Sequence, residues 1–345
     1  MKSLIPVALV LSLSALCGDP PKVQTPGAKE KARAQAMSSA AGAWLAALPE
    51  ELKARANPAF ESEDRTHWGY MEGERQGIAL GEQDGKERGL LDGLLGEGLS
   101  QKGLLAVHSI MSLQEVLERD PNSYFATVFG DPAGTEPWGW RLEGHHVSLN
   151  FTVQNGEFVT ATPLFLGADP AEVTDGPKAG LAPFREEEGV VRSLVDKLGA
   201  KVRTPPGHKP KIPDDVLLGP ARDEPFAQRE GVRPGELGMS EGFFFMKLLS
   251  LHVSVLHADL AQKALERYRD HDIKDLDFVW SGSDKPGEPF YYRLQGLKKG
   301  LAVEYLNRGN HVHCVWRDFN DDFGAGPIAA WEKRKAEEGE DGGGK

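Results

Sequence analysis

The chain has 345 residues and a net charge of −12, and hydrophobic residues make up 40% of it. This length and apolar content suffice for one large domain or two modest ones. The acidic balance argues against a nucleic-acid partner, which would favour a basic patch.

The N-terminus reads MKSLIPVALVLSLSALCGDPPKVQTPG, a pattern typical of an exported protein. A lysine precedes an apolar run from Leu4 to Leu16, which is shorter than the roughly 20 residues of a bilayer span but matches the core of a secretory signal peptide. Cys17 follows directly, which resembles a bacterial lipoprotein signal, although Leu16 stands where a small residue is usual. We predict a signal peptide over residues 1–17 with lipidation of Cys17; plain secretion and a buried N-terminal segment are the alternatives.

Export would place the protein in the cell envelope, held there by a lipid anchor, or outside the cell. In this interpretation the lipid anchor is the only contact with a membrane. The second cysteine, Cys314, lies far from Cys17, and two such cysteines give no disulfide framework. The mature fold therefore depends on its hydrophobic core.

Helical patterns dominate the first third of the chain. Residues 18–31 have little apolar content and are predicted to be a linker, and residues 32–49 are predicted to be a helix. A second helical zone runs from about Leu90 to Arg119, where apolar residues recur mostly at intervals of three and four. Several glycines weaken its first half, because glycine costs about 1 kcal/mol against alanine in a helix.

A block of strands follows Pro121. YFATVFG is typical of one strand and WGWRLEGHHVSLNFTV of a single long strand. NGE is a hairpin signal, and FVTATPLFLG would be the return strand. The block therefore predicts an antiparallel sheet.

The second half has a similar order of helices and then strands. Residues 184–200 are predicted to be an amphipathic helix, residues 203–238 a long surface loop, and a helix capped by Ser240 to run to about Tyr268. The segments LDFVWSG, PFYYRLQG, LAVEYL and HVHCVWRDF then form a second β block. The tail, residues 329–345, is polar and glycine-rich and is predicted to be disordered.

This order predicts an α+β fold, in which antiparallel β-sheet blocks pack with helices and the N-terminal region is helical. One domain is expected over residues 32–328. The sequence has no glycine-rich phosphate loop after a strand and no HExxH helix. Its GxSxG string, GMSEG at residues 238–242, follows the predicted surface loop and not a strand, as a nucleophile elbow would. The common nucleotide-binding, serine-hydrolase and metalloprotease motifs are therefore excluded.

Four of the ten histidines lie in two short runs, EGHHVSLN and NHVHCVWRD. In the hairpin LAVEYLNRGNHVHCVWRD, a turn centred on Arg308 and Gly309 would place Glu304 opposite His313. His311 would share that face, because side chains alternate along a strand. Two imidazoles and a carboxylate on one face suit Zn²⁺, Cu²⁺ or Fe²⁺, so Glu304, His311 and His313 are predicted metal ligands.

The strand that carries GHH would supply a third imidazole. On a single strand His145 and His146 point to opposite faces, and the His146 face also carries Trp138, Trp140, Leu142, Ser148 and Asn150. The His145 face continues with apolar residues and is typical of core. We therefore predict His146 as a metal ligand or catalytic base with Asn150 beside it, and His145 as a secondary candidate.

The segment WRDFNDDFG adds polar groups after the second histidine run. Arg317 lies on the His311 face by alternation and is a candidate to hold a substrate carboxylate, with Asp318 as a catalytic candidate and Asp322 as a secondary one. The alternative is a solvated turn that closes the sheet. Cys314 points to the other face and is interpreted as core.

Several segments together resemble a bacterial and fungal family known as domain of unknown function 3500: ESEDRTHWGY, FGDPAGTEPWGWRLEGHHVSLNFTV, FYYRLQG and VEYLNRGNHVHCVWRDFNDDFG. The resemblance extends from about residue 32 to residue 328 and implies no settled activity. Its motifs single out His145, His146, Asn150, Glu304, His311, His313, Arg317, Asp318 and Asp322. The family pattern often has an aspartate after the tyrosine of the closing hairpin, where this chain has Leu306.

From these observations we expect an exported, metal-dependent enzyme, a hydrolase or an oxidoreductase, that acts on a small molecule or an extracellular polymer. The metal would activate water by lowering its pKa. A histidine acid–base site without a metal is a second interpretation. A third is a non-catalytic envelope lipoprotein that binds a ligand on its tryptophans and has structural histidines.

Overall fold

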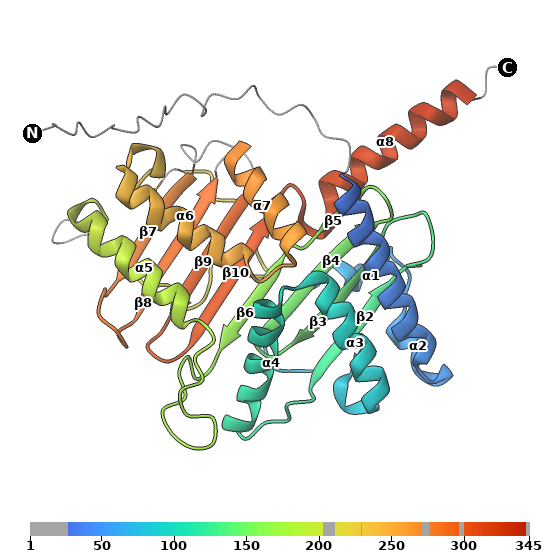
Figure 1. Ribbon diagram of the computed structural model, residues 1–345, viewed down its shortest axis with the longest axis horizontal. Helices are drawn as coiled ribbons and strands as arrows, with labels where there is room; N and C mark the ends of the chain where they lie inside the picture. The colour runs from blue at the N-terminus through green and yellow to red at the C-terminus, as the bar shows by residue number, and fades with distance from the viewer. Residues whose placement is uncertain (1–26, 203–210, 229, 271–275, 297–299, 343–345) are drawn as a thin grey trace, which may run out of the picture.

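One large antiparallel sheet organises the protein, and the helices cover one of its faces (Figure 1). The computed structural model describes residues 27–202, 211–228, 230–270, 276–296 and 300–342. The strands are β1 (Ile78–Ala79), β2 (Tyr124–Phe129), β3 (Trp138–Gly144), β4 (Val147–Gln154), β5 (Phe158–Thr160), β6 (Leu164–Ala168), β7 (Leu276–Gly282), β8 (Phe290–Gly296), β9 (Leu301–Asn307) and β10 (Val312–Asp318). Their order is β1-β2-β3-β4-β6-β10-β9-β8-β7, and β5 pairs with β4. The predicted α+β class is confirmed.

The two predicted strand blocks join into this one sheet. Strands β2 to β6 come from the first block and β7 to β10 from the second, and β6 pairs with β10 along the junction. The predicted return strand is divided into β5 and β6, which pair with opposite ends of the same strand β4. The junction therefore lies next to the turn that carries GHH.

The helices are α1 (Ala28–Ala47), α2 (Glu50–Ala56), α3 (Gly85–Gly98), α4 (Gln101–Val116), α5 (Arg185–Leu198), α6 (Met239–Val253), α7 (Ala258–Asp270) and α8 (Ala325–Gly342). Helices α1, α3, α4, α5, α6 and α7 lie over one face of the sheet, here called the helix face (Figure 1). Alternate strand residues such as Trp140, Leu142 and Trp316 pack there in the main hydrophobic core.

Two helices that were predicted to be continuous are each divided in two. The zone from Leu90 to Arg119 is split between α3 and α4, where Ser100 caps α4 by accepting from the Gly103 amide. The helix expected from Ser240 to Tyr268 is split between α6 and α7 and begins at Met239, after Gly238.

The connection between α3 and α4 lies beside the connection between α6 and α7, and backbone hydrogen bonds join the two. The Ser100 amide donates to the Val255 carbonyl, and the His257 amide donates to the Gly98 carbonyl. A Cβ on Gly103 would lie 2.0 Å from the Val255 carbonyl oxygen. Glycine at this position therefore permits a close approach of the two connections, and tertiary hydrogen bonds replace helical ones.

The chain termini also differ from the expectation. Helix α1 begins at Ala28, within the segment predicted as a linker. Most of the tail predicted to be disordered, residues 329–342, is helical in α8, where Arg334 pairs with Glu157 and Lys335 with Glu136. The segment is rich in alanine, lysine and glutamate, which favour helix.

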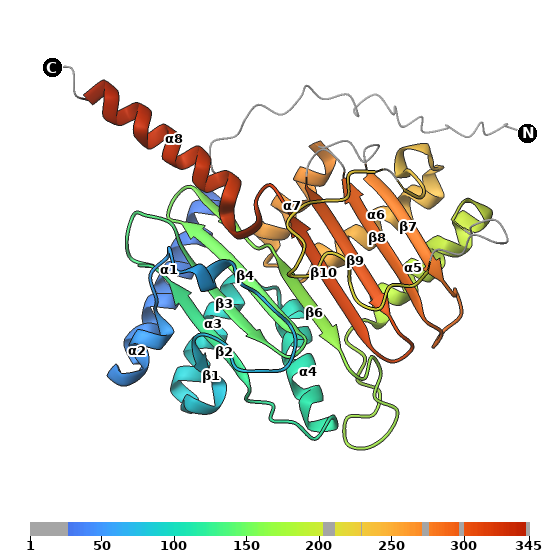
Figure 2. The ribbon, with the colours of Figure 1, turned by 180° about the vertical axis from the view of Figure 1, so that it is seen from behind.

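The opposite face of the sheet, here called the loop face, is crossed by the segments 57–77, 211–228 and 230–237 (Figure 2). The second segment belongs to the predicted surface loop, yet its Val216 and Leu218 are buried against the sheet. They pack in a second cluster that includes Tyr70, Phe165 and Val315. The site described below lies on this face.

The predictions for residues 1–17, including lipidation of Cys17, lie outside the described residues. Among the helices that the structure does describe, none combines the length and apolar content that a bilayer crossing requires.

Candidate metal centre

Three histidines from separate parts of the chain converge at the junction of the two strand blocks. The Nε2 atom of His146 lies 2.9 Å from Nε2 of His311 and 3.2 Å from Nε2 of His313. One ligand nitrogen of each ring lies within 4.8 Å of the others. The structure thus brings together three of the four residues predicted to hold a metal.

His146 reaches this point from a turn, and the prediction of one long strand through GHH is wrong. Strand β3 ends at Gly144, which pairs with Val147 at the start of β4, so His145 and His146 form the connection. His146 has a φ of 65°, a left-handed conformation that histidine adopts more readily than most non-glycine residues. Its amide donates to the Tyr70 carbonyl at 2.9 Å, and its carbonyl accepts from the Gly167 amide at 2.8 Å.

Gly167 on β6 makes room for this ring. A Cβ at that position would lie 2.9 Å from Cδ2 of His146. The imidazole can therefore rest against the backbone of β6, directly beside β10. The turn also separates residues that were predicted to share one face with His146. Trp138, Trp140 and Leu142 point to the helix face. Ser148 and Asn150 point to the loop face, together with Arg141 and Glu143.

His311 and His313 come from the closing hairpin, whose register differs from the prediction by two residues. Val312 pairs with Asn307 and His313 with Leu306, so His311 belongs to the loop before β10. Because the shift is an even number, Glu304 still shares a face with His313. Glu304 lies opposite Val315, however, and not opposite His313 as predicted.

Glu304 is consequently outside the histidine group. Its carboxylate is fully buried and accepts from the Leu218 amide at 2.7 Å and from the Tyr291 hydroxyl at 2.6 Å. Burial raises the pKa of this carboxyl, although those hydrogen bonds act in the opposite direction. The residue ties a loop to the sheet, and the predicted ligand role of Glu304 does not fit this geometry.

A carboxylate that the sequence did not single out takes a place beside the histidines. Oδ1 of Asp215 lies 2.6 Å from Nδ1 of His313, and Oδ2 of Asp215 accepts from the Tyr70 hydroxyl at 3.0 Å. An Nδ1–H donated to Asp215 leaves the lone pair of His313 on Nε2, which faces the other two imidazoles. Asp215 lies 98 residues before His313 in an aperiodic loop, so no spacing pattern could have indicated it.

The surroundings of His146 and His311 favour the neutral imidazole, the form that binds a metal. Burial lowers the pKa of His146 to about 2, and the neighbouring charges of His145 and His313 act in the same direction. Burial, followed by the charge of His313, lowers the pKa of His311 as well. Burial alone would raise the pKa of Asp215, but its hydrogen bond and ion pair with His313 bring that pKa below its ordinary value.

The separations of the His146 nitrogen from those of His311 and His313 suit a tetrahedral metal ion. Zinc–nitrogen bonds of about 2.0–2.1 Å separate two ligand nitrogens by about 3.3–3.4 Å. The separations of 2.9 and 3.2 Å are within a few tenths of an ångström of that value. One Nε2–H on His146 can bridge to only one neighbour at a time, whereas a cation satisfies all three lone pairs at once. The donor set fits Zn²⁺, Cu²⁺ or Fe²⁺.

Access to the centre is from the side of His311. His146 and His313 are 2% and 8% exposed, whereas His311 is only half-buried. The His145 ring stacks on His146 with centroids 3.9 Å apart. Arg119 donates to His145 at 3.0 Å, and burial together with this guanidinium lowers the pKa of His145 to about 4. His145 therefore supports the ring of His146.

The remaining candidate residues are engaged elsewhere. Asn150 donates to Ser148 and to the Pro163 carbonyl. Arg317 is buried, pairs with Asp322 at 2.6 Å and donates to three backbone carbonyls, those of Leu218, Gly219 and Arg222. Asp318 alternates with Arg317 and shares the helix face with Trp316, away from the histidines.

Arg317 and Asp322 therefore fix the loop that follows β10, and both are buried, so the segment is not the solvated turn of the alternative. Cys314 also points to the helix face, where its Sγ lies 3.6 Å from Nδ1 of the buried His252. Leu306, at the position where the family pattern often has an aspartate, pairs with His313 and packs in the loop-face cluster.

The chain belongs to the family described as protein of unknown function DUF3500, whose family model matches residues 30–325. This match confirms the resemblance inferred from the motifs. Neither the curated proteins nor the solved structures contain a match to the chain.

Proposed function

We propose that the protein is a metal-dependent enzyme whose metal is held by His146, His311 and His313, with Zn²⁺ as the best fit. The observation that carries the proposal is the convergence of three Nε2 atoms with separations of 2.9 and 3.2 Å in a largely buried place. A zinc ion with three protein ligands and one open position lowers the pKa of a bound water to about 7, which suits hydrolysis at neutral pH.

Each residue around the centre has a distinct task in this proposal. Asp215 accepts from His313 and orients its ring, and Tyr70 in turn holds Asp215. The turn conformation of His146, supported by two backbone hydrogen bonds, aims its ring at the same point. His311 is the most exposed of the three, so a substrate would approach on its side.

The location and the substrate class are part of the same proposal. A signal peptide over residues 1–17 would export the protein, and a lipid on Cys17 would hold it in the cell envelope; secretion without a lipid is the alternative. The substrate would then be a small molecule or an extracellular polymer.

Elemental analysis of the purified protein, after growth with added Zn²⁺, Cu²⁺ and Fe²⁺, tests the metal. We expect about one equivalent of zinc per chain, with loss of that metal in the His311→Ala/His313→Ala double variant. His108→Ala is the matched control, because His108 on α4 pairs with Asp92, outside the centre. Less than about a tenth of an equivalent of any transition metal in the wild type would refute the proposal. Copper or iron in place of zinc would redirect the search from hydrolysis to oxidation.

A second function is favoured by one observation, the hydrogen-bonding distances among the imidazoles themselves. In this alternative the protein is a non-catalytic envelope protein, and the histidines form a structural network that connects the two strand blocks. His311→Ala would then lower the melting temperature, and neither the wild type nor the variant would contain metal. Loss of bound metal without a change in melting temperature would exclude it.

A further inference from the structure

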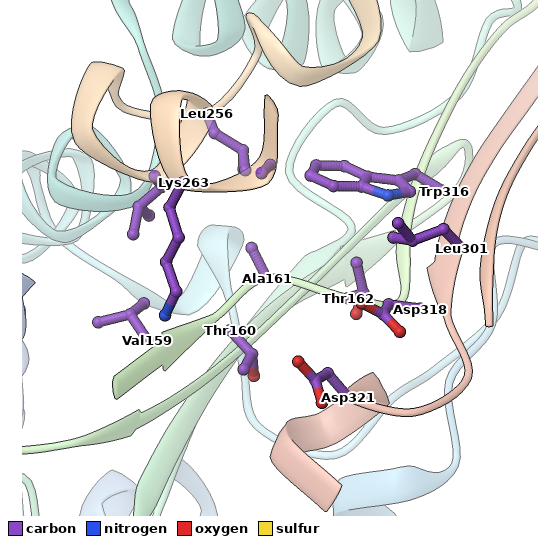
Figure 3. A pocket seen from close by; sticks show the side chains of 12 residues that line it. Val159, Thr160, Ala161, Thr162, Leu256, Lys263, Leu301, Trp316, Asp318 and Asp321 are labelled. Atoms are coloured by element: carbon purple, nitrogen blue, oxygen red, sulfur yellow. The ribbon is translucent and has the colours of Figure 1, made fainter. Parts of the chain in front are cut away.

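A small cavity lies on the helix face, beneath α7 and beside the start of β9 and the end of β10 (Figure 3). Its volume is about 50 Å³. Leu256 and Leu260 close it from the side of α7, and Leu301 and Trp316 line it from the strands. His313 and Trp316 point to opposite faces of the sheet, so this cavity is separate from the histidine centre.

Two buried polar atoms in the wall of this cavity have no hydrogen-bond partner among the described residues. They are Nε1 of Trp316 and Oγ1 of Thr160, whose residues are 6% and 8% exposed. In Figure 3 the indole edge that carries Nε1 faces the space enclosed by the labelled side chains. Buried polar groups in native proteins are nearly always paired, so each unpaired one requires an explanation.

The volume limits what could pair with them. One water molecule requires about 10–15 Å³ of cavity volume, so this cavity of about 50 Å³ accommodates about three to five non-hydrogen atoms. Its walls are mostly apolar: Val159, Ala161, Leu256, Leu260, Ala264 and Leu301. Water alone would gain few contacts from such walls, whereas a small organic molecule would bury its apolar part against them.

The charges around the cavity disfavour an anion. The carboxylates of Asp318 and Asp321 both line it. Lys263 also lines it, but its ammonium group pairs with Glu30 on α1. A carboxylic acid would therefore lie beside two acidic side chains, and the lysine that lines the cavity already pairs with Glu30.

We infer that this cavity binds a small neutral molecule with an apolar body and one hydrogen-bond acceptor, such as a short-chain ketone, aldehyde or alcohol. Its oxygen would accept from the Trp316 indole N–H. The remainder would pack against Leu256, Leu260 and Leu301. The inference does not depend on the metal proposed at the histidine centre.

Indole N–H signals in a nitrogen–proton correlation spectrum provide a direct test. The full chain, labelled with ¹⁵N-tryptophan, has seven tryptophans, and Trp316→Phe identifies the signal of Trp316. Titration with 2-butanone should move that signal saturably with a Kd of about 1 mM, a range reached by ligands of this size. The other indole signals should not move with the same dependence.

Two substitutions on α7 form a matched pair for this experiment. Ala264→Leu extends a side chain into the cavity and should weaken binding of 2-butanone at least about tenfold. Ala261→Leu makes the same change on a residue that lines a different pocket beside α7, and binding should persist. Ala161→Val makes a smaller extension into the same cavity and should weaken binding about threefold or more, which keeps the test valid if Ala264→Leu fails to fold.

The inference is overturned if the Trp316 signal does not respond up to about 20 mM ketone, well above the Kd expected for this size of ligand. It is also overturned if Ala264→Leu and wild type respond equally while both are folded. Either outcome would mean that the cavity holds only water.

Discussion

The carboxylate of Asp215 controls the orientation of His313, so Asp215→Asn should weaken metal binding while the protein remains folded. In the wild type, Oδ1 accepts from His313 at 2.6 Å and Oδ2 accepts from Tyr70 at 3.0 Å. An asparagine amide has only one oxygen. It can serve one of these donors, and its NH₂ group then faces the other.

The size of the effect follows from this mismatch. If the amide NH₂ faces Nδ1, His313 must place its proton on Nε2 and loses the lone pair that faces the centre. If the amide oxygen faces Nδ1, the hydrogen bond survives but the negative charge that strengthens it is gone. Changes at such outer carboxylates usually cost 10–100-fold in metal affinity, and we expect a loss of about this size, equivalent to about 1.4–2.7 kcal/mol.

Competition with a chelator of known zinc affinity, at constant pH and ionic strength, measures this loss. Asp214→Asn is the matched control, because the Asp214 side chain is 84% exposed and pairs with Arg308 at 3.3 Å. It removes the same charge from the neighbouring position without contact to His313. Circular dichroism of both variants establishes that they are folded.

The reasoning is refuted if Asp215→Asn binds zinc as tightly as the wild type. It is also refuted if Asp214→Asn shows an equal loss, because the effect would then be one of general charge and not of the hydrogen bond to His313.

Three further outcomes are expected. Gly103→Ala should lower the free energy of unfolding in urea by about 1–3 kcal/mol, because its Cβ would lie 2.0 Å from the Val255 carbonyl oxygen. Gly93→Ala is the control: a Cβ there has no atom within 4 Å, so the free energy of unfolding should rise by up to about 1 kcal/mol. A Gly103→Ala variant as stable as the wild type would contradict the packing of the two helix connections. Arg317→Met should lower the free energy of unfolding by about 3–5 kcal/mol, because it leaves the buried Asp322 without its ion-pair partner. The metal content of the folded variant should be unchanged. Loss of metal at unchanged stability would instead indicate a role for Arg317 at the metal centre. Burial raises the pKa of Glu304, so the stability that its protonated form contributes is full below the ordinary carboxyl pKa and is lost as the pH rises through the raised folded-state pKa. Glu304→Gln should therefore reduce the slope of unfolding free energy against pH in this range. An unchanged slope would disprove the raised pKa of Glu304.

Much of the sheet could be predicted from the sequence because its signals are local. The four segments that become β7 to β10 are each rich in aromatic or β-branched residues. The breaks between α3 and α4 and between α6 and α7 could not be predicted in the same way. They are held by hydrogen bonds between Ser100 and Val255 and between His257 and Gly98, groups more than 150 residues apart.

For the candidate site, alternation along the strand was more informative than register. His311 and His313 were expected to act together, and they converge even though the hairpin loop is longer than predicted. His146 was singled out on the assumption of a continuous strand, whereas it lies in a turn with a left-handed backbone. In that case the residue was correctly grouped with the others, but the local reason was wrong.

The difference between the histidines and Glu304 has a simple geometric origin. An even error in register leaves every side chain on its predicted face but moves it along the strand by two residues, about 6–7 Å. Alternation along the strand alone places His313 on the loop face. The β3–β4 turn brings His146 to that face, and the hairpin loop brings His311. A ligand role for Glu304 required the absolute register as well, and the shift placed it opposite Val315. The carboxylate beside His313 comes instead from Asp215, whose position depends on how residues 211–228 cross the sheet, and no strand pattern encodes that path. The imidazoles are therefore the part of the centre that local sequence patterns can indicate, and the groups that orient them are set by tertiary structure.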